Sequence, residues 1–150
     1  MRLALFQPDI PQNTGTIMRL CACLNIAMDI IEPCGFVLSD KNLKRAGMDY
    51  LEHLDLSKHS SWESFKTAHK GKRLILMTTK SDSSFLDFEF QPDDILIAGR
   101  ESAGVPDDVV EDCFASVTIP MSENTRSINV AIASSMILSE GLRQTGLYPS

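Results

Sequence analysis

Compact apolar runs that alternate with stretches of helical spacing constrain the fold of this chain more than any other feature. The runs lie at Arg2–Phe6, Met28–Ile31, Arg73–Met77 and Asp94–Ala98, and turn residues bound each of them. Short apolar runs of this kind are typical of buried strands. Because helical segments separate them, we predict an α/β fold with a mostly parallel sheet flanked by helices.

The segments around these strands carry helical patterns. Asn13–Leu24 repeats its apolar residues at helical spacing, and Ser61–His69 begins with a serine suited to an N-cap. Ile128–Leu142 is apolar on a broad face and rich in small residues. A short helix is expected from Pro106 to about Cys113, followed by a strand at Ser116–Ile119. With 150 residues and no repeat or linker, the chain is expected to form one domain, residues 1–150.

Composition limits the classes of protein to which the chain can belong. The sequence is 43% hydrophobic and 23% charged, and it contains no apolar run of the roughly 18 residues that a membrane span needs. The apolar N-terminal stretch is too short for a signal peptide, so a soluble cytoplasmic protein is expected. The net charge of −6 argues against non-specific coating of nucleic acid. Local basic clusters remain possible at Lys41, Lys44 and Arg45, and at Lys66, Lys70, Lys72 and Arg73.

The cysteines and histidines show no spacing typical of a structural metal site. Cys21, Cys23, Cys34 and Cys113 do not form the paired clusters that structural zinc requires, so reduced thiols are expected. The three histidines, at positions 53, 59 and 69, are predicted to lie on the surface.

Three loops that follow predicted strands concentrate the polar residues of interest. The first, residues 8–15, leads into a helix that carries Asn13 and Arg19; the second is residues 99–106; the third, residues 119–130, contains Ser127 and Asn129. Ligands of open α/β sheets bind beyond the carboxyl ends of strands, which would gather these loops at one edge. Taken singly, each loop also suits helix caps, a surface arginine or a glycine-rich turn.

In order and spacing, the loops resemble the three motifs of the SPOUT (SpoU/TrmH-like) methyltransferases. These motifs are Asn-x-Gly-x-x-x-Arg at 13–19, Gly-x-Glu-x-x-Gly-x-Pro at 99–106, and Pro-Met followed by Arg-Ser-x-Asn at 120–129. The resemblance covers essentially the whole chain. It is closest to the single-domain TrmL-type enzymes that methylate the ribose 2′-oxygen of the tRNA wobble nucleotide. Ser139 departs from the tyrosine common there, and Val130-Ala131 from Leu-Ser.

The resemblance implies a deep C-terminal trefoil knot, a homodimer, S-adenosylmethionine as cofactor and no metal in the reaction. It places the cofactor on Met77, Thr78, Gly99, Gly104, Ile119, Met121 and Ser127. It assigns the chemistry to Arg19, supported by Asn13, Glu101, Ser127 and Asn129. Since a guanidinium is almost always protonated, we expect Arg19 to stabilise the ribose oxygen rather than act as a base.

The expected RNA-binding residues are Lys41, Lys44, Arg45 and Tyr50, although a solvated charged turn explains any one of them equally well. Two other functions remain open at this point. One is 2′-O-methylation of another tRNA position or of rRNA. The other is a non-catalytic module that binds RNA or a nucleotide, which would fit the lack of a convenient base near the three loops.

Overall fold

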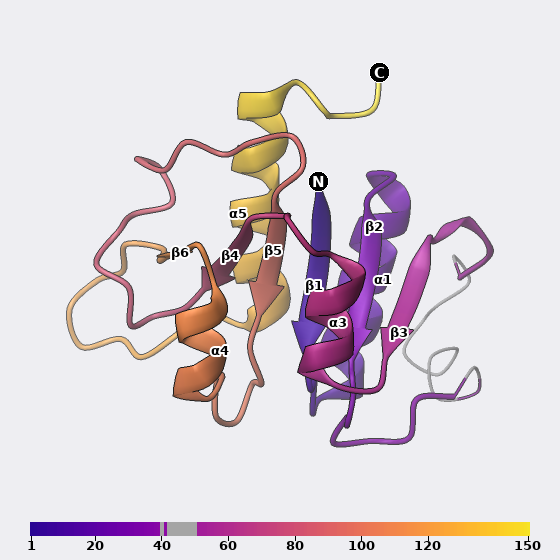
Figure 1. Cartoon of the computed structure of the whole chain (residues 1–150). Helices are drawn as coiled ribbons and strands as arrows, with labels where there is room; N and C mark the ends of the chain where they lie inside the picture. The colour runs from indigo at the N-terminus through magenta and orange to yellow at the C-terminus, as the bar shows by residue number, and fades with distance from the viewer. Residues whose placement is uncertain (40, 42–50) are drawn as a thin grey trace.

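A six-stranded parallel sheet forms the centre of the molecule, in the order β3-β2-β1-β5-β4-β6 (Figure 1). The computed structural model describes residues 1–39, 41 and 51–150. The strands are β1 (Arg2–Phe6), β2 (Ala27–Ile31), β3 (Leu56–His59), β4 (Leu74–Met77), β5 (Ile95–Ala98) and β6 (Ala115–Val117). The predicted α/β fold with a parallel sheet is therefore confirmed.

Helices cover both faces of the sheet and create two apolar cores. In Figure 1, α3 (Trp62–Ala68) and α4 (Asp107–Asp112) lie in front of the sheet, whereas α1 (Pro11–Cys23) and α5 (Val130–Thr145) lie behind it. The side chains of β1 alternate between the cores: Leu3 and Leu5 pack with α1 and α5, and Ala4 and Phe6 pack with α3. A short 3-10 helix, η1 (Leu51–His53), precedes β3. No described helix is long and apolar enough to cross a membrane.

Local sequence signals explain where two of the helices begin. Ser61 caps α3 as predicted: its hydroxyl accepts a hydrogen bond from the Ser64 amide at 3.1 Å, and the Ser64 hydroxyl accepts one from the Ser61 amide at 3.3 Å. Asn129 caps α5 through bonds from the amides of Ala131 and Ile132. These side chains satisfy amides that lack a partner within the helix.

Two strands differ from the predictions. The last strand spans Ala115–Val117, not Ser116–Ile119, because the chain bends away from β4 after Val117 and Thr118 instead bridges to Ser84. β3 was not predicted at all. Its sequence, Leu-Ser-Lys-His, is polar because it lies at the edge of the sheet and none of its residues is fully buried.

The segment between β4 and β5 packs against α5 without forming a helix. Phe85 and Phe90 are buried in the core beside α5. The Gln144 side chain ties the segment down, because its amide nitrogen donates to the Phe88 carbonyl and its oxygen accepts from the Phe90 amide, both at 2.9 Å. About one turn earlier in α5, the hydroxyl of Ser139 hydrogen-bonds to that of Tyr148. Tyr148 thus lies beside Ser139, the position at which the TrmL-type enzymes commonly have a tyrosine.

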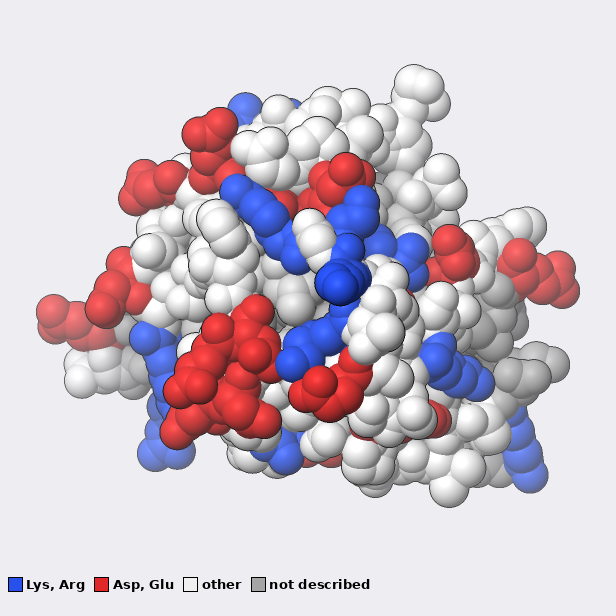
Figure 2. All heavy atoms as spheres, in the orientation of Figure 1, with Lys and Arg blue, Asp and Glu red and all other residues white. Residues whose placement is uncertain are grey.

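Charged side chains intermingle on the face that carries α3 and α4, where basic groups are bordered by acidic ones (Figure 2). Lys66 pairs with Asp112 at 2.8 Å, Lys72 with Asp93 at 3.7 Å and Arg73 with Asp94 at 2.7 Å. Ion pairs therefore neutralise most of the second basic cluster that the sequence suggested. This makes it a poor surface for RNA phosphates.

The cap of α3 gives a direct test of the fold. We expect Ser61→Ala to lower the free energy of unfolding by about 1 kcal/mol, because the Ser64 amide loses its acceptor. Urea denaturation measures this change. Ser60→Ala, at the exposed neighbouring serine, is the matched control and should leave the midpoint unchanged. Equal effects of the two substitutions would show that the cap contributes nothing.

Candidate active site

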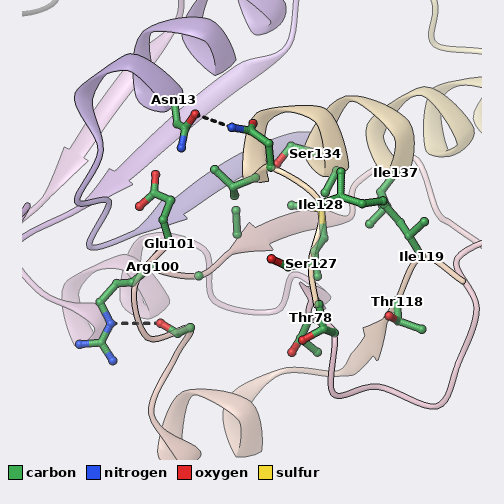
Figure 3. Close-up of a pocket in the computed structure, with 18 of the residues that line it drawn as sticks. Asn13, Thr78, Arg100, Glu101, Thr118, Ile119, Ser127, Ile128, Ser134 and Ile137 are labelled. Atoms are coloured by element: carbon green, nitrogen blue, oxygen red, sulfur yellow. Dashed lines mark hydrogen bonds between the residues drawn. The ribbon is translucent and has the colours of Figure 1, made fainter. Parts of the chain in front are cut away.

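A cavity of about 380 Å³ opens at the carboxyl ends of β4, β5 and β6 (Figure 3). Residues that directly follow these strands line it, together with the first turns of α1 and α5. Segments from all three predicted loops contribute to its wall, so the loops do meet at one edge of the sheet. Its volume lies in the range of small-molecule sites, roughly 300–1,000 Å³.

The cavity brings together nearly all of the predicted cofactor and catalytic residues. Its lining contains every predicted cofactor position: Met77, Thr78, Gly99, Gly104, Ile119, Met121 and Ser127. It also contains four of the five predicted catalytic positions: Asn13, Glu101, Ser127 and Asn129. In Figure 3, Asn13 and Glu101 lie on one side of the cavity and Thr78 and Thr118 on the other.

Arg19 is the predicted residue that the cavity does not include. Its side chain is exposed on α1, and it is not among the lining residues. Arg19 lies six positions after Asn13 on α1. Helix geometry therefore rotates it about 240° around the helix axis from Asn13 and moves it about 9 Å along that axis. The two motif-one residues therefore face different surroundings within one chain.

The loop of residues 99–104 closes on itself through its backbone. Arg100 and Gly104 exchange two backbone hydrogen bonds, at 3.0 and 2.8 Å, and the Arg100 side chain also donates to the Gly104 carbonyl. A Cβ at Gly99 would lie 2.9 Å from the Gly104 carbonyl carbon, and Gly104 itself has a φ of 61°. Glycine at 99 is thus required by the close approach of the loop's own backbone, not only by a ligand as the sequence suggested.

Asn13 and Asn129 join the first and third motifs. The Asn129 amide nitrogen donates to the Asn13 side-chain oxygen at 3.0 Å while the Asn129 oxygen caps α5. Asn13 is not the helix cap that its position in the sequence suggested. Pro11 opens α1 two residues earlier, and Ile10 stands at the N-cap without a side-chain bond. The Asn13 side chain is consequently available to α5.

Glu101 and Asp9 form a linked acidic pair at the cavity edge. The Asp9 amide donates to Glu101 Oε2 at 3.0 Å, and the Ser102 hydroxyl donates to the Asp9 carboxylate. Burial and the hydrogen bond with the Asp9 carboxyl raise the pKa of Glu101. Hydrogen bonds from Glu101 and Ser102 lower the pKa of Asp9. The shifts therefore favour Glu101 over Asp9 as the member of the pair that is protonated first as pH falls.

The walls of the cavity combine apolar side chains with a few polar groups. Ile119, Ile128 and Ile137 contribute apolar surface, whereas Thr78 and Ser127 contribute hydroxyls. Ser134 also lines the cavity, and its buried hydroxyl has no hydrogen-bond partner among the described residues. A buried hydroxyl without a partner is costly, so a ligand that reaches it gains a hydrogen bond.

Sequence reasoning missed Asp9, Ser134 and Ile137. Asp9 lies within the first loop, but only its contact with Glu101, 92 positions away, marks it out. Ser134 and Ile137 lie three residues apart and therefore share a face of α5 with the cavity. Of the predicted RNA-binding residues, Lys41 is exposed, and Lys44, Arg45 and Tyr50 lie outside the described residues.

Comparison with known families decides which class this site belongs to. The model of the SpoU rRNA Methylase family matches residues 1–139. The chain belongs to the SpoU rRNA methylase family. All three motif loops fall within the matched range. The cavity is therefore lined by the segments of the fold that carry the motifs.

Relatives and solved structures agree with this assignment. A protein of Beijerinckia indica subsp. indica named tRNA (cytidine(34)-2′-O)-methyltransferase is 53% identical over 146 residues, which cover 96% of this chain and 91% of the relative. A structure described as "Structural insights into the 2-OH methylation of C/U34 on tRNA" superposes with a TM-score of 0.90 at 38% identity, covering 95% of this chain and 94% of the other. The SpoU methyltransferase AviRb from Streptomyces viridochromogenes, in complex with AdoMet, has a TM-score of 0.81 at 26% identity, covering 96% and 60%.

The acidic pair predicts a specific dependence of stability on pH. The pKa of Glu101 is raised in the folded protein, so this side chain stabilises the fold at pH values below its unfolded pKa of about 4.5. The stabilisation is lost as pH rises through the pKa of Glu101 in the folded protein. Glu101→Gln keeps a donor toward Asp9 but cannot ionise. We therefore expect the variant to gain stability relative to the native chain as pH rises above 4.5.

Urea unfolding at a series of pH values measures this difference. The lowered pKa of Asp9 makes the fold lose stability as pH falls, but only below the unfolded pKa of about 3.8. The pH ranges over which Asp9 and Glu101 affect stability are therefore separate. Glu123→Gln, at an exposed loop glutamate outside the cavity lining, is the control. If the Glu101→Gln and native curves run parallel from pH 4 to 8, the pKa of Glu101 is not raised in the folded protein.

Proposed function

We propose that this SpoU-family chain transfers a methyl group from S-adenosylmethionine to the ribose 2′-oxygen of the tRNA wobble nucleotide, cytidine or a modified uridine. The observation that carries the proposal is the cavity built by all three motif loops. Relatives that match over nearly their full length are named for this reaction, at up to 53% identity.

The cavity suits the chemistry of S-adenosylmethionine. Ile119, Ile128 and Ile137 offer apolar surface for an adenine ring, and the backbone near Met77 and Gly99 offers polar groups at the strand ends. The unpartnered Ser134 hydroxyl points to a polar ligand rather than a purely apolar one. Residues at all seven predicted cofactor positions contribute to this wall. The cofactor, when bound, supplies an activated methyl group on a sulfonium that is a good leaving group, so the reaction needs no metal.

The chain then has to hold the ribose hydroxyl in line with the methyl group, because positioning supplies much of the rate enhancement. Arg19 lies outside the cavity, so we assign it to the RNA and not to the cofactor. There its cation stabilises the ribose oxygen as the hydroxyl loses its proton, or binds the adjacent phosphate. Hydrogen bonds of Asn13, Glu101 and Asn129 hold the motif loops together around the cavity, and Ser127 lines it.

Three further expectations belong to the same proposal. We infer that the C-terminal segment forms the deep trefoil knot of this superfamily. We also infer a homodimer that uses α5, whose Ile132 and Met136 are exposed large hydrophobic side chains. The protein then acts as a single catalytic domain over residues 1–150 in the cytoplasm, where its tRNA substrate is found.

Incubation with labelled S-adenosylmethionine and hypomodified tRNA, followed by nucleoside mapping, tests the function directly. A 2′-O-methylated nucleoside at the wobble position is the expected product. Label at another tRNA position, or only in rRNA, would show that the reaction is as proposed but that the substrate is a different nucleotide. Cofactor binding without any transfer to either RNA would contradict the proposed activity and favour a binding module.

Arg19→Ala should lower methyl transfer at least about 100-fold, the loss expected when a group that stabilises a developing oxyanion is removed. Cofactor affinity should stay within a few fold, because Arg19 does not line the cavity. Single-turnover transfer and equilibrium cofactor binding measure the two effects separately. Lys58→Ala, at an exposed cation on β3, is the control. Transfer retained in Arg19→Ala would remove this residue from the mechanism.

The RNA contact is tested by charge reversal. We expect Lys44→Glu combined with Arg45→Glu to weaken tRNA binding and to flatten its dependence on salt, because fewer phosphates would be neutralised. Lys70→Glu combined with Lys72→Glu makes the same change in charge in the other basic cluster and should have a smaller effect. Filter binding between low and moderate salt measures both. Equal losses would show that net charge, and not this segment, controls binding.

A further inference from the structure

Asp29 gathers three basic side chains at a place remote from the cavity. It is fully buried on β2, yet its carboxylate accepts from Arg2 Nε at 2.8 Å and lies 2.7 Å from His59 Nε2 and 3.1 Å from His69 Nε2. The side chains of His59 and His69 are only 11% and 14% exposed. The prediction that these two histidines lie on the surface is therefore wrong, because β3 and α3 fold them onto a buried acid.

The group lies on the opposite face of the sheet from the helices α1 and α5. Side chains alternate along β2, so that Met28 and Ile30 join the core beside α5, whereas Asp29 shares its face with Ile31 and α3. His59 pairs with Ile31 across the β2–β3 ladder and thus points to the same side. His69 caps the end of α3 above them. Asp29, His59 and His69 thus come from three separate elements: β2, β3 and the end of α3.

Aromatic packing fixes both imidazole rings. The Phe65 ring centroid lies 5.3 Å from that of His59 and 5.0 Å from that of His69, and the two histidine rings are 5.7 Å apart. Both Nε2 atoms are directed at a single oxygen, Asp29 Oδ1, and one nitrogen or oxygen from each of the three residues lies within 4.8 Å of the others. Two imidazoles and one carboxylate so arranged are a ligand set for a transition-metal ion.

We propose that Asp29, His59 and His69 bind one divalent transition-metal ion of the zinc type. In a tetrahedral zinc site with bonds of about 2.0–2.1 Å, ligand atoms lie about 3.4 Å apart. The distances from Asp29 Oδ1, 2.7 Å to His59 and 3.1 Å to His69, need to lengthen by about 0.7 and 0.3 Å to reach this value. On binding, each histidine gives up the Nε2 proton that it donates to Asp29, carries its remaining proton on Nδ1 and presents Nε2 to the ion. Water takes the remaining position at the partly exposed edge.

Arg2 supports the site from its far side. It holds the other carboxylate oxygen, Asp29 Oδ2, which orients Asp29 in the way that hydrogen bonds behind metal ligands commonly do. A ligand set without thiolates favours Zn²⁺, Co²⁺ or Ni²⁺ over Cu⁺.

Binding at this site would join β2, β3 and α3 and stabilise the fold without entering the methyl-transfer chemistry on the other face. Because the ion binds the folded chain, it should raise Tm by an amount that grows with the logarithm of the free-ion concentration once this exceeds Kd. The inference concerns the scaffold and does not depend on the proposed function.

Titration of the purified protein with Zn²⁺ by calorimetry, and with Co²⁺ by visible absorption, tests the proposal. We expect one equivalent to bind, a tetrahedral Co²⁺ spectrum and a higher Tm. His69→Gln is the decisive variant, because its side-chain amide can still donate to Asp29 while being a poor metal ligand. It should fold and lose at least about ten-fold in affinity. His59→Gln should behave in the same way.

Two controls separate this site from ordinary surface binding. His53→Gln removes an exposed histidine outside the cluster, and Cys23→Ser removes an exposed thiol. Both should leave affinity and the Tm shift unchanged. The proposal is overturned if the native chain binds Zn²⁺ no more tightly than His69→Gln, or if either control variant abolishes binding. A purely structural network of hydrogen bonds would give the first of these results.

Discussion

The pairing of β1 with β5 is the contact on which the rest of the structure depends. It joins Arg2–Leu5 to Ile95–Ala98, segments about ninety positions apart, and both strands are almost fully buried in the middle of the sheet. Because the two strands are parallel neighbours, the loops at their carboxyl ends leave side by side. That proximity places Asp9 against Glu101 and Ser102, and it forms the edge of the cavity. Residues elsewhere on the sheet then complete the site.

The two faces of the sheet carry different chemistry for a simple geometric reason. Successive side chains of a strand point to opposite faces, so one strand serves two environments. On β2, Met28 and Ile30 pack toward α1 and α5, the helices whose first turns line the cavity, while Asp29 meets His59 and His69 under α3. A change in the histidine cluster can therefore alter stability without touching the residues that line the cavity.

The position of Arg19 separates the two proposed tasks of the site, cofactor binding and RNA recognition. The cavity contains the three motif loops and an unpartnered serine hydroxyl, whereas the arginine of motif one lies outside it on α1. Binding of a small cofactor and recognition of a large RNA place different demands on a surface. A partly apolar pocket serves the first, and an exposed cation serves the second.

The sequence by itself determined the α/β class, five of the six strands, the capped start of α3 and the three motif loops, since these depend on local periodicity, turn residues and spacing. The sequence also predicted ten of the residues that line the cavity, because motif spacing and the ends of predicted strands mark them. Only the tertiary structure left Arg19 outside the cavity, paired Asp9 with Glu101 and brought His59 and His69 onto Asp29. Those contacts depend on the order β3-β2-β1-β5-β4-β6 and on the turn of each helix over the sheet. Local patterns do not encode which distant strands become neighbours, because that choice is made by the burial of the whole core.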